Sequence, residues 1–173
     1  SVDSDRNQLF STVYNTGTPT TASLAFGVTY EIEIGGGGAG SPSGNTSPTG
    51  DNGGDSFISS SDSNYPFSVY SFGGGAGASD YGTGNSVNFN ARSGSSGGGA
   101  TGNGSPQAFG TDGQGFEGGA YGGSYYPGSG GGAGGPGRNR AGDGGKGRRW
   151  DILGQEYWWA GGGAGAGYSQ RAG

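Results

Sequence analysis

The chain has 173 residues, and 48 of them are Gly, about 28% against a usual fraction near 7%. Leu, Ile, Val and Phe together make up 20 residues, about 12%, which excludes an ordinary aliphatic core, and interior Gly at about 1 kcal/mol each excludes a helix bundle. The formal charge is −5, and Cys and His are absent, which excludes disulfides, thiolate zinc sites and the usual general base at neutral pH.

The first predicted element is a β region within residues 1–34, which we expect to form an N-terminal attachment segment. Residues 24–26 and 28–34 are the two predicted strands. In the second strand Val28, Tyr30, Ile32 and Ile34 alternate with Thr29, Glu31 and Glu33. This pattern predicts one apolar face and one polar face, and it ends where the glycine runs begin.

Residues 35–173 form the predicted glycine-rich domain, in which eight glycine runs are separated by turn and aromatic segments. The runs are 35–40, 53–54, 73–77, 97–104, 118–123, 128–137, 142–147 and 161–167. Asn-Gly and Asp-Gly dipeptides between runs are typical of turns. The regular interleaving favours an up-and-down arrangement of short elements.

A glycine run can form a polyproline-II-like helix, with three residues per turn and no internal hydrogen bonds. Such helices can approach until backbones touch and exchange N–H···O=C hydrogen bonds, which satisfies their buried polar groups. The alternative is a disordered Gly/Ser segment. The 21 aromatic residues favour the folded alternative.

Several stretches resemble the glycine-rich domain of phage tail-fibre adhesins, in particular the distal tip adhesins of T-even-like phages. These stretches are YEIEIGGGGAG at 30–40, GGDSF at 53–57, GGGAG at 73–77, GGGAGGPG at 130–137 and YWWAGGGAG at 157–165. The glycine-rich ectodomain of anaplastic lymphoma kinase is also similar, but it uses Cys pairs. The resemblance implies an irregular, mainly non-α fold: a sandwich of polyglycine-II helices whose far-end loops contact a bacterial receptor.

If the runs alternate in direction, the loops 41–52, 78–96, 124–127 and 148–160 share the end far from the strand at 28–34. Rigid aromatics in loops offer a large contact area at low entropy cost. The candidate receptor-binding residues are Tyr81, Phe89, Tyr125, Tyr126, Trp150, Trp158 and Trp159. The alternative for the three Trp residues is a small hydrophobic cluster that caps the glycine sandwich.

Five of the eight basic residues lie within 138–149. This segment could bind acidic polysaccharide or nucleic acid. A solvated edge that pairs with the acidic first half of the chain is a third interpretation. We expect no nucleic-acid partner, because the chain is acidic overall and has no Arg-Gly-Gly repeat.

No catalytic, cofactor or metal site is predicted. The G-x-G-x-x-G match at 132–137 follows no predicted strand, and Lys146 is followed by Gly147 where a P-loop needs Ser or Thr. Spacing typical of a calcium loop is also missing. No apolar run reaches the roughly 18 residues of a membrane span, so we expect no membrane insertion.

The sequence therefore predicts a non-enzymatic adhesin on a phage tail fibre, located in the virion at the fibre tip or extracellularly. Its expected partners are a bacterial outer-surface protein or polysaccharide, and the fibre shaft or other copies of itself. The alternative is a structural subunit of a glycine-rich extracellular filament or virion fibre. A receptor ectodomain is disfavoured by the lack of Cys.

Overall fold

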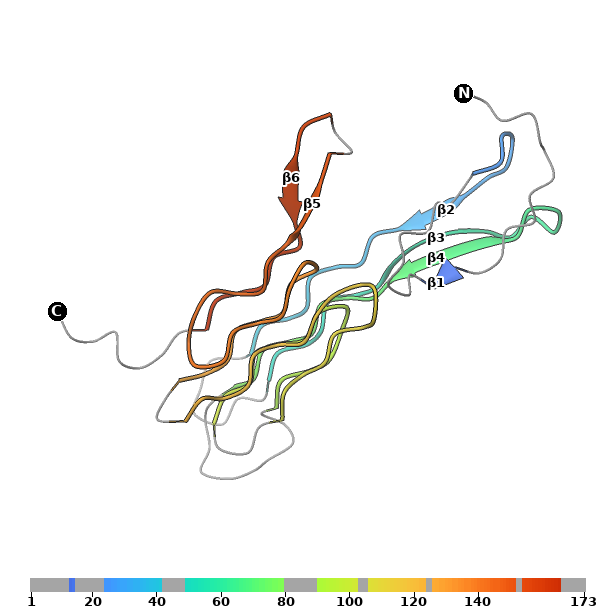
Figure 1. The fold of residues 1–173 in the computed structure, drawn as a ribbon. Helices are drawn as coiled ribbons and strands as arrows, with labels where there is room; N and C mark the ends of the chain where they lie inside the picture. Colours follow the sequence, from blue (N-terminus) through green and yellow to red (C-terminus); the bar gives the residue numbers. More distant parts are fainter. Residues whose placement is uncertain are drawn as a thin grey trace.

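The computed structural model describes residues 13–14, 24–41, 49–79, 90–102, 106–123, 126–151 and 154–165. These residues contain no α-helix, and the fold is mainly non-α (Figure 1). The described strands are β1 (Val13–Tyr14), β2 (Glu31–Glu33), β3 (Ser56–Ser60), β4 (Phe67–Ser71), β5 (Arg148–Trp150) and β6 (Tyr157–Trp159). Most of the remaining described chain is extended, glycine-rich backbone.

Four of the strands form one sheet in the order β1-β4-β3-β2. The β1–β4 pair is parallel, and the other two pairs are antiparallel. Ile32 pairs with Ile58, and Ile58 pairs with Val69, so these apolar side chains share one face. Phe67 is buried, and its ring packs edge-on against Tyr30 at 5.6 Å.

The predicted strand at 28–34 is present in its centre as β2, but the predicted strand at 24–26 is wrong. Phe26 and Gly27 form a turn instead, and Gly27 has a φ of 80°, a left-handed conformation that interrupts strand geometry. Ile32 and Ile34 are exposed, because β2 is the edge strand. The sheet also joins strands from both sides of the predicted boundary at residue 35.

Glycine-rich segments continue away from the sheet and bond to one another through their backbones. The described segments are 35–41, 49–55, 72–79, 90–95, 96–102, 106–111, 115–123, 126–132, 135–141, 142–147 and 161–165. Asp51 donates its N–H to Ala39, and Gly54 donates to Gly36, so these antiparallel bonds recur every third residue. The same step of three occurs in parallel pairs, such as those from Gly75 and Ala78 to 96–102.

Residues 128–133, here called the central segment, have the most hydrogen-bonded surroundings. Every N–H in the central segment donates to a backbone carbonyl of another segment or of the adjoining turn. In chain order the acceptors are Ala100, Arg138, Gly163, Gly97, Gly135 and Ala160. The same three neighbouring regions are therefore visited in rotation, with a period of three residues.

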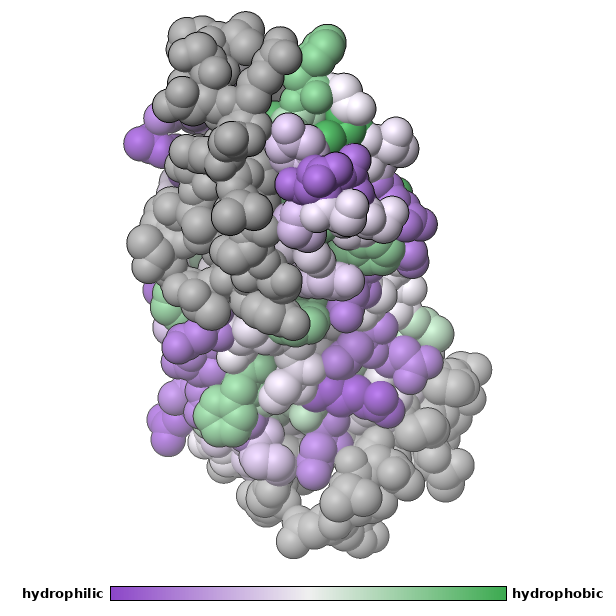
Figure 2. All heavy atoms as spheres, turned by 90° about the vertical axis from the view of Figure 1, so that its right-hand side faces the viewer, coloured by the Kyte–Doolittle hydropathy of each residue, from purple (hydrophilic) through white to green (hydrophobic). Residues whose placement is uncertain are grey.

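The interior of these segments consists largely of backbone. Residues 97–100, 118–119, 128–129 and 131–132 are buried, and they are Gly except for Ala100 and Ser129. Only Phe67, Ala100 and Ala108 are buried hydrophobic residues in the described chain. Figure 2 shows hydrophobic residues as separate patches among hydrophilic ones on one face of the molecule. An aliphatic core of ordinary size is therefore replaced by backbone contacts.

The segments alternate in direction between two ends of the molecule (Figure 1). We call the end with the β1–β4 sheet and the β5–β6 hairpin the hairpin end. The opposite end, where segments 35–41, 72–79, 96–102 and 115–123 finish, is called the loop end. The prediction that 148–160 lies with 41–52 at the far end is wrong, because strands β5 and β6 extend from the same end of the glycine segments as the β1–β4 sheet.

The cause of this difference is a turn inside the glycine run 128–137. Gly132 donates its N–H to Gly135, and Ser129 donates to Arg138, so the run folds back on itself as two segments. One additional reversal moves everything after it to the opposite end. Segments 90–95 and 106–111 are also additional to the predicted runs, but together they add two reversals, which cancel.

Candidate functional site

The β5–β6 hairpin is the most exposed group of aromatic residues in the described chain. Its register pairs Arg148 with Trp159, Arg149 with Trp158, and Trp150 with Tyr157. All six residues are exposed, and the hairpin stands apart from the β1–β4 sheet (Figure 1). Gly147 allows the two strands to approach at the base, because a Cβ there would overlap the carbonyl of Trp159.

Strand alternation gives the hairpin two chemically different faces. Arg148, Trp150, Tyr157 and Trp159 share one face, which we call the ring face. The rings of Tyr157 and Trp159 lie 6.1 Å apart in an edge-on arrangement. The opposite face carries Arg149 and Trp158.

An ion pair occupies the opposite face. Arg149 Nη1 lies 3.0 Å from Glu156 Oε2, and both side chains are more than half exposed. No ion pair of Arg148 is present within the described residues, so its guanidinium is available beside the aromatic rings. The ring face thus combines three aromatic side chains with one uncompensated positive charge.

The alternative prediction that Trp150, Trp158 and Trp159 cap the glycine sandwich is wrong. Their exposed fractions are 56%, 67% and 45%, because they lie on a two-stranded hairpin and no other described strand pairs or packs with it. Their role as receptor contacts stays a prediction.

The basic segment 138–149 does not pair with the acidic first half within the described part of the chain. Arg149 uses Glu156 of the same hairpin, and the other ion pair there joins Arg92 to Asp51 at 3.7 Å. Arg138 and Arg140 lie close to the loop end, whereas Lys146 and Arg148 lie at the hairpin end. The basic residues are therefore divided between the two ends.

The remaining candidate residues belong to the loop end or to undescribed parts of the chain. Tyr81, Phe89 and Tyr125 lie outside the described residues. Tyr126 is half-buried, and its backbone forms a tight turn by accepting from Gly122 and donating to Gly123. The prediction that Tyr126 and the Trp residues lie at one end is therefore wrong, because the hairpin is at the opposite end from Tyr126.

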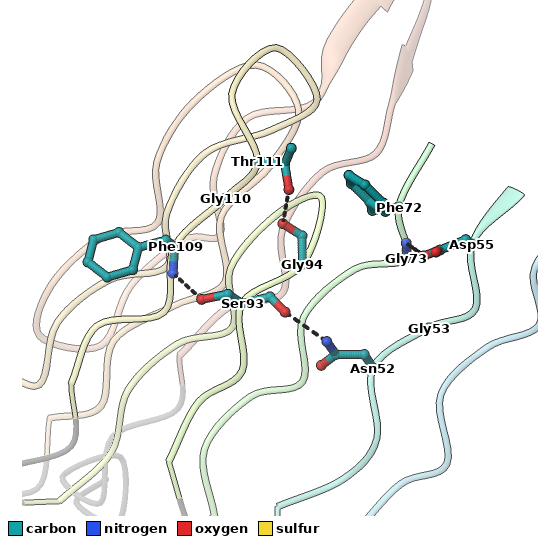
Figure 3. A pocket seen from close by; sticks show the side chains of 10 residues that line it. All are labelled: Asn52, Gly53, Asp55, Phe72, Gly73, Ser93, Gly94, Phe109, Gly110 and Thr111. Carbon is teal, nitrogen blue, oxygen red and sulfur yellow. Dashed lines mark hydrogen bonds between the residues drawn. The ribbon is translucent and has the colours of Figure 1, made fainter. Parts of the chain in front are cut away.

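An open groove of about 290 Å³ lies between segments 49–55, 72–79, 90–95 and 106–111 (Figure 3). Asn52 joins three of these segments, since Nδ2 donates to Ser93 O at 2.7 Å and Oδ1 accepts from Ala76 N at 3.0 Å. Asp55 accepts from Gly73 N, and Thr111 donates to Gly94 O. Because its polar side chains bond backbone, this groove is a structural junction.

Two residues of the ring face were not among the predicted site residues. Arg148 lies in the basic segment, and Tyr157 begins the YWW sequence. The sequence does contain a signal that links the two residues. RRW at 148–150 and YWW at 157–159 are separated by a short connection that contains Gly154, and this arrangement is typical of a hairpin.

The described residues hold no group of three or more Asp, Glu, His or Cys side chains that could bind a metal ion. They also hold no helix with the length and apolarity needed to cross a membrane.

The fold and the hairpin together define a non-α domain that is packed through glycine backbone and presents exposed aromatic side chains. The family model for the glycine-rich domain matches residues 11–173. The chain therefore belongs to the glycine-rich domain family. Neither a curated protein nor a solved structure gives a significant match.

Proposed function

We propose that the chain is a phage tail-fibre adhesin whose glycine segments are polyglycine-II helices packed as a sandwich. The three-residue period of the hydrogen bonds supports this conformation, because a polyproline-II-type helix has three residues per turn. Successive N–H groups of the central segment donate to three neighbouring regions in turn, as expected for a three-residue-per-turn helix packed among parallel and antiparallel neighbours. The rigid scaffold then holds recognition loops.

The observation that carries the adhesin proposal is the gathering of chain connections at the loop end. The described segments that finish at Ser41, Ser79, Gly102 and Gly123 all reach this end. An open groove of about 380 Å³ lies beside them, lined by residues from 39–41, 50–51 and 76–79. Loops on a rigid scaffold are the usual carriers of binding residues. Tyr126 lies at this end, and we propose it as a receptor contact together with Tyr81, Phe89 and Tyr125, which are outside the described residues.

The test is competition for the host surface. Purified chain should block adsorption of the phage to its bacterial host, and the double variant Tyr125→Ala/Tyr126→Ala should lose this effect. Phe26→Ala is the matched control, because Phe26 is fully exposed at the hairpin end. Equal blocking by the double variant and the control would contradict the assignment of these Tyr residues. Failure of the unaltered chain to block would contradict the adhesin proposal itself.

The second candidate function is a structural subunit of a glycine-rich filament, and one observation favours it. A Cβ atom on Gly36, Gly37, Gly40, Gly74 or Gly77 would meet nothing within 4 Å. These glycines therefore lack a packing reason inside the described chain, and their bare backbone could pack against another copy. Spontaneous assembly of purified chain into ordered filaments, seen by electron microscopy, would support this function; a stable monomer that blocks adsorption would oppose it.

A further inference from the structure

We propose that the ring face of the β5–β6 hairpin binds an acidic glycan containing uronic-acid residues. This inference goes beyond the adhesin proposal, because the hairpin lies at the end opposite the proposed receptor loops. It requires nothing of those loops.

The aromatic rings provide the apolar part of such a site. A pyranose ring has a face of C–H groups, and the face of an aromatic ring is electronegative, so the two surfaces are complementary. Trp150, Tyr157 and Trp159 offer three such rings on one side of a short sheet. Tyr157 also places a polar group at the edge of the ring face: its hydroxyl donates to Gln155 Oε1 at 3.3 Å.

Arg148 specifies an acidic ligand. It lies directly across from Trp159, and no ion pair of its guanidinium is found in the described chain. An Arg fork matches a carboxylate with two parallel hydrogen bonds. On the opposite face the corresponding Arg149 is already neutralised by Glu156. Charge complementarity therefore favours an anionic ligand on the ring face only.

The size of the ring face favours a glycan over a folded protein. The exposed parts of its three aromatic residues amount to roughly 220–365 Å², given about 150–250 Å² for a whole aromatic side chain. A stable protein interface buries about 800 Å² on each partner. A short oligosaccharide needs much less surface. Single-stranded nucleic acid would need a track of phosphate-binding cations, whereas the ring face carries a single cation, Arg148.

Tryptophan fluorescence can test the proposal in the intact chain, because all three Trp residues lie in this hairpin. A tetramer of galacturonic acid should change the emission in a saturable titration, and a neutral tetramer of glucose should bind at least tenfold more weakly. Tetraglutamate and a short oligothymidylate test plain polyanions and nucleic acid. Equal or tighter binding of any of these three probes would overturn the proposal, as would the absence of saturable binding by galacturonate.

Matched variants on the two faces sharpen the test. Trp159→Ala should weaken galacturonate binding at least tenfold, whereas Trp158→Ala should change it less than twofold. Arg148→Gln should reduce the acidic preference to the level of the neutral sugar, whereas Arg149→Gln should not. The Arg pair leaves every ring in place, so it remains informative if Trp159→Ala unfolds the hairpin. Equal effects from the two faces would overturn the proposal, and concentration-dependent self-association at the ring face would indicate a second copy as the occupant.

Discussion

The carbonyl oxygen of Gly119 occupies the space that a Cβ atom on Gly128 would need. Both residues are buried, and each belongs to a segment that runs the length of the glycine region. At this contact the packing surface is the backbone itself. The same relationship recurs between Gly98 and Ala76, and between Gly144 and Gly162, so Gly is a steric requirement at many interior positions.

Gly128→Ala should therefore destabilise the chain. Overpacking of a close-packed interior costs about 1–3 kcal/mol, and here the neighbour is backbone that cannot rotate away. We expect a loss of about 2 kcal/mol or more in the free energy of unfolding, measured by thermal or denaturant unfolding. Gly37→Ala is the control, because its Cβ would meet nothing within 4 Å. Equal losses in the two variants would contradict packing through bare backbone.

Amide hydrogen exchange should separate the central segment from the outer segment 35–41. All six N–H groups of 128–133 donate within the fold, whereas the Gly37 N–H donates no hydrogen bond within the described residues. Exchange requires opening of a hydrogen bond, so the central segment should exchange orders of magnitude more slowly. Similar exchange rates at Gly37 and Gly131 would indicate that the segments do not pack as described.

Ser129→Ala should be costly for a conservative change. The Ser129 side chain is nearly fully buried; its Oγ accepts from Arg138 N at 2.6 Å and can donate to Asp143 O at 2.8 Å. Removal of the hydroxyl leaves the Arg138 N–H and the Asp143 carbonyl without this partner, at about 1–3 kcal/mol. Thr101→Val is the matched control, because Thr101 Oγ1 is buried with no partner among the described residues. A loss for Thr101→Val as large as for Ser129→Ala would contradict this interpretation.

Asn52→Ala should loosen the junction beside the groove in Figure 3. The variant loses the bond to Ser93 and leaves the Ala76 N–H without its acceptor, at a combined cost of about 1–2 kcal/mol. Asn52→Asp keeps an acceptor for Ala76 but brings a charge against the Ser93 carbonyl, so it should also destabilise. Asn64→Ala, at an exposed position, should unfold at the same denaturant concentration as the unaltered chain. Denaturant unfolding would measure all three variants.

Gly154→Ala should affect the hairpin alone. Gly154 has a φ of 80°, which costs a residue with a side chain about 1–2 kcal/mol, and its N–H closes a turn onto Asp151. The expected result is a change in tryptophan emission with little change in the unfolding temperature, because within the described residues the hairpin makes no contact with the sheet. Coupled loss of both signals would show that hairpin and glycine segments unfold together.

The strand at Glu31–Glu33 and the lack of an ordinary core followed from the sequence, because period-two alternation and composition are local properties. Strands β3 and β4 were missed. Phe57, Ile58, Val69 and Tyr70 lie in short Ser-rich stretches whose strand character depends on pairing with each other and with β2. Pairing between distant stretches leaves little trace in a short window of sequence.

The sequence by itself determined that Gly supplies the packing surface, since 48 glycines in runs leave little side-chain volume for any other core. Only the tertiary structure decided at which end the Trp residues lie. That outcome depends on the reversal at 133–135, where Gly135-Pro136 is the one local turn signal in a run otherwise made of Gly and Ala. Gly accepts extended and turning conformations almost equally, so hydrogen bonds with neighbouring segments, and not local preference, select where the chain reverses.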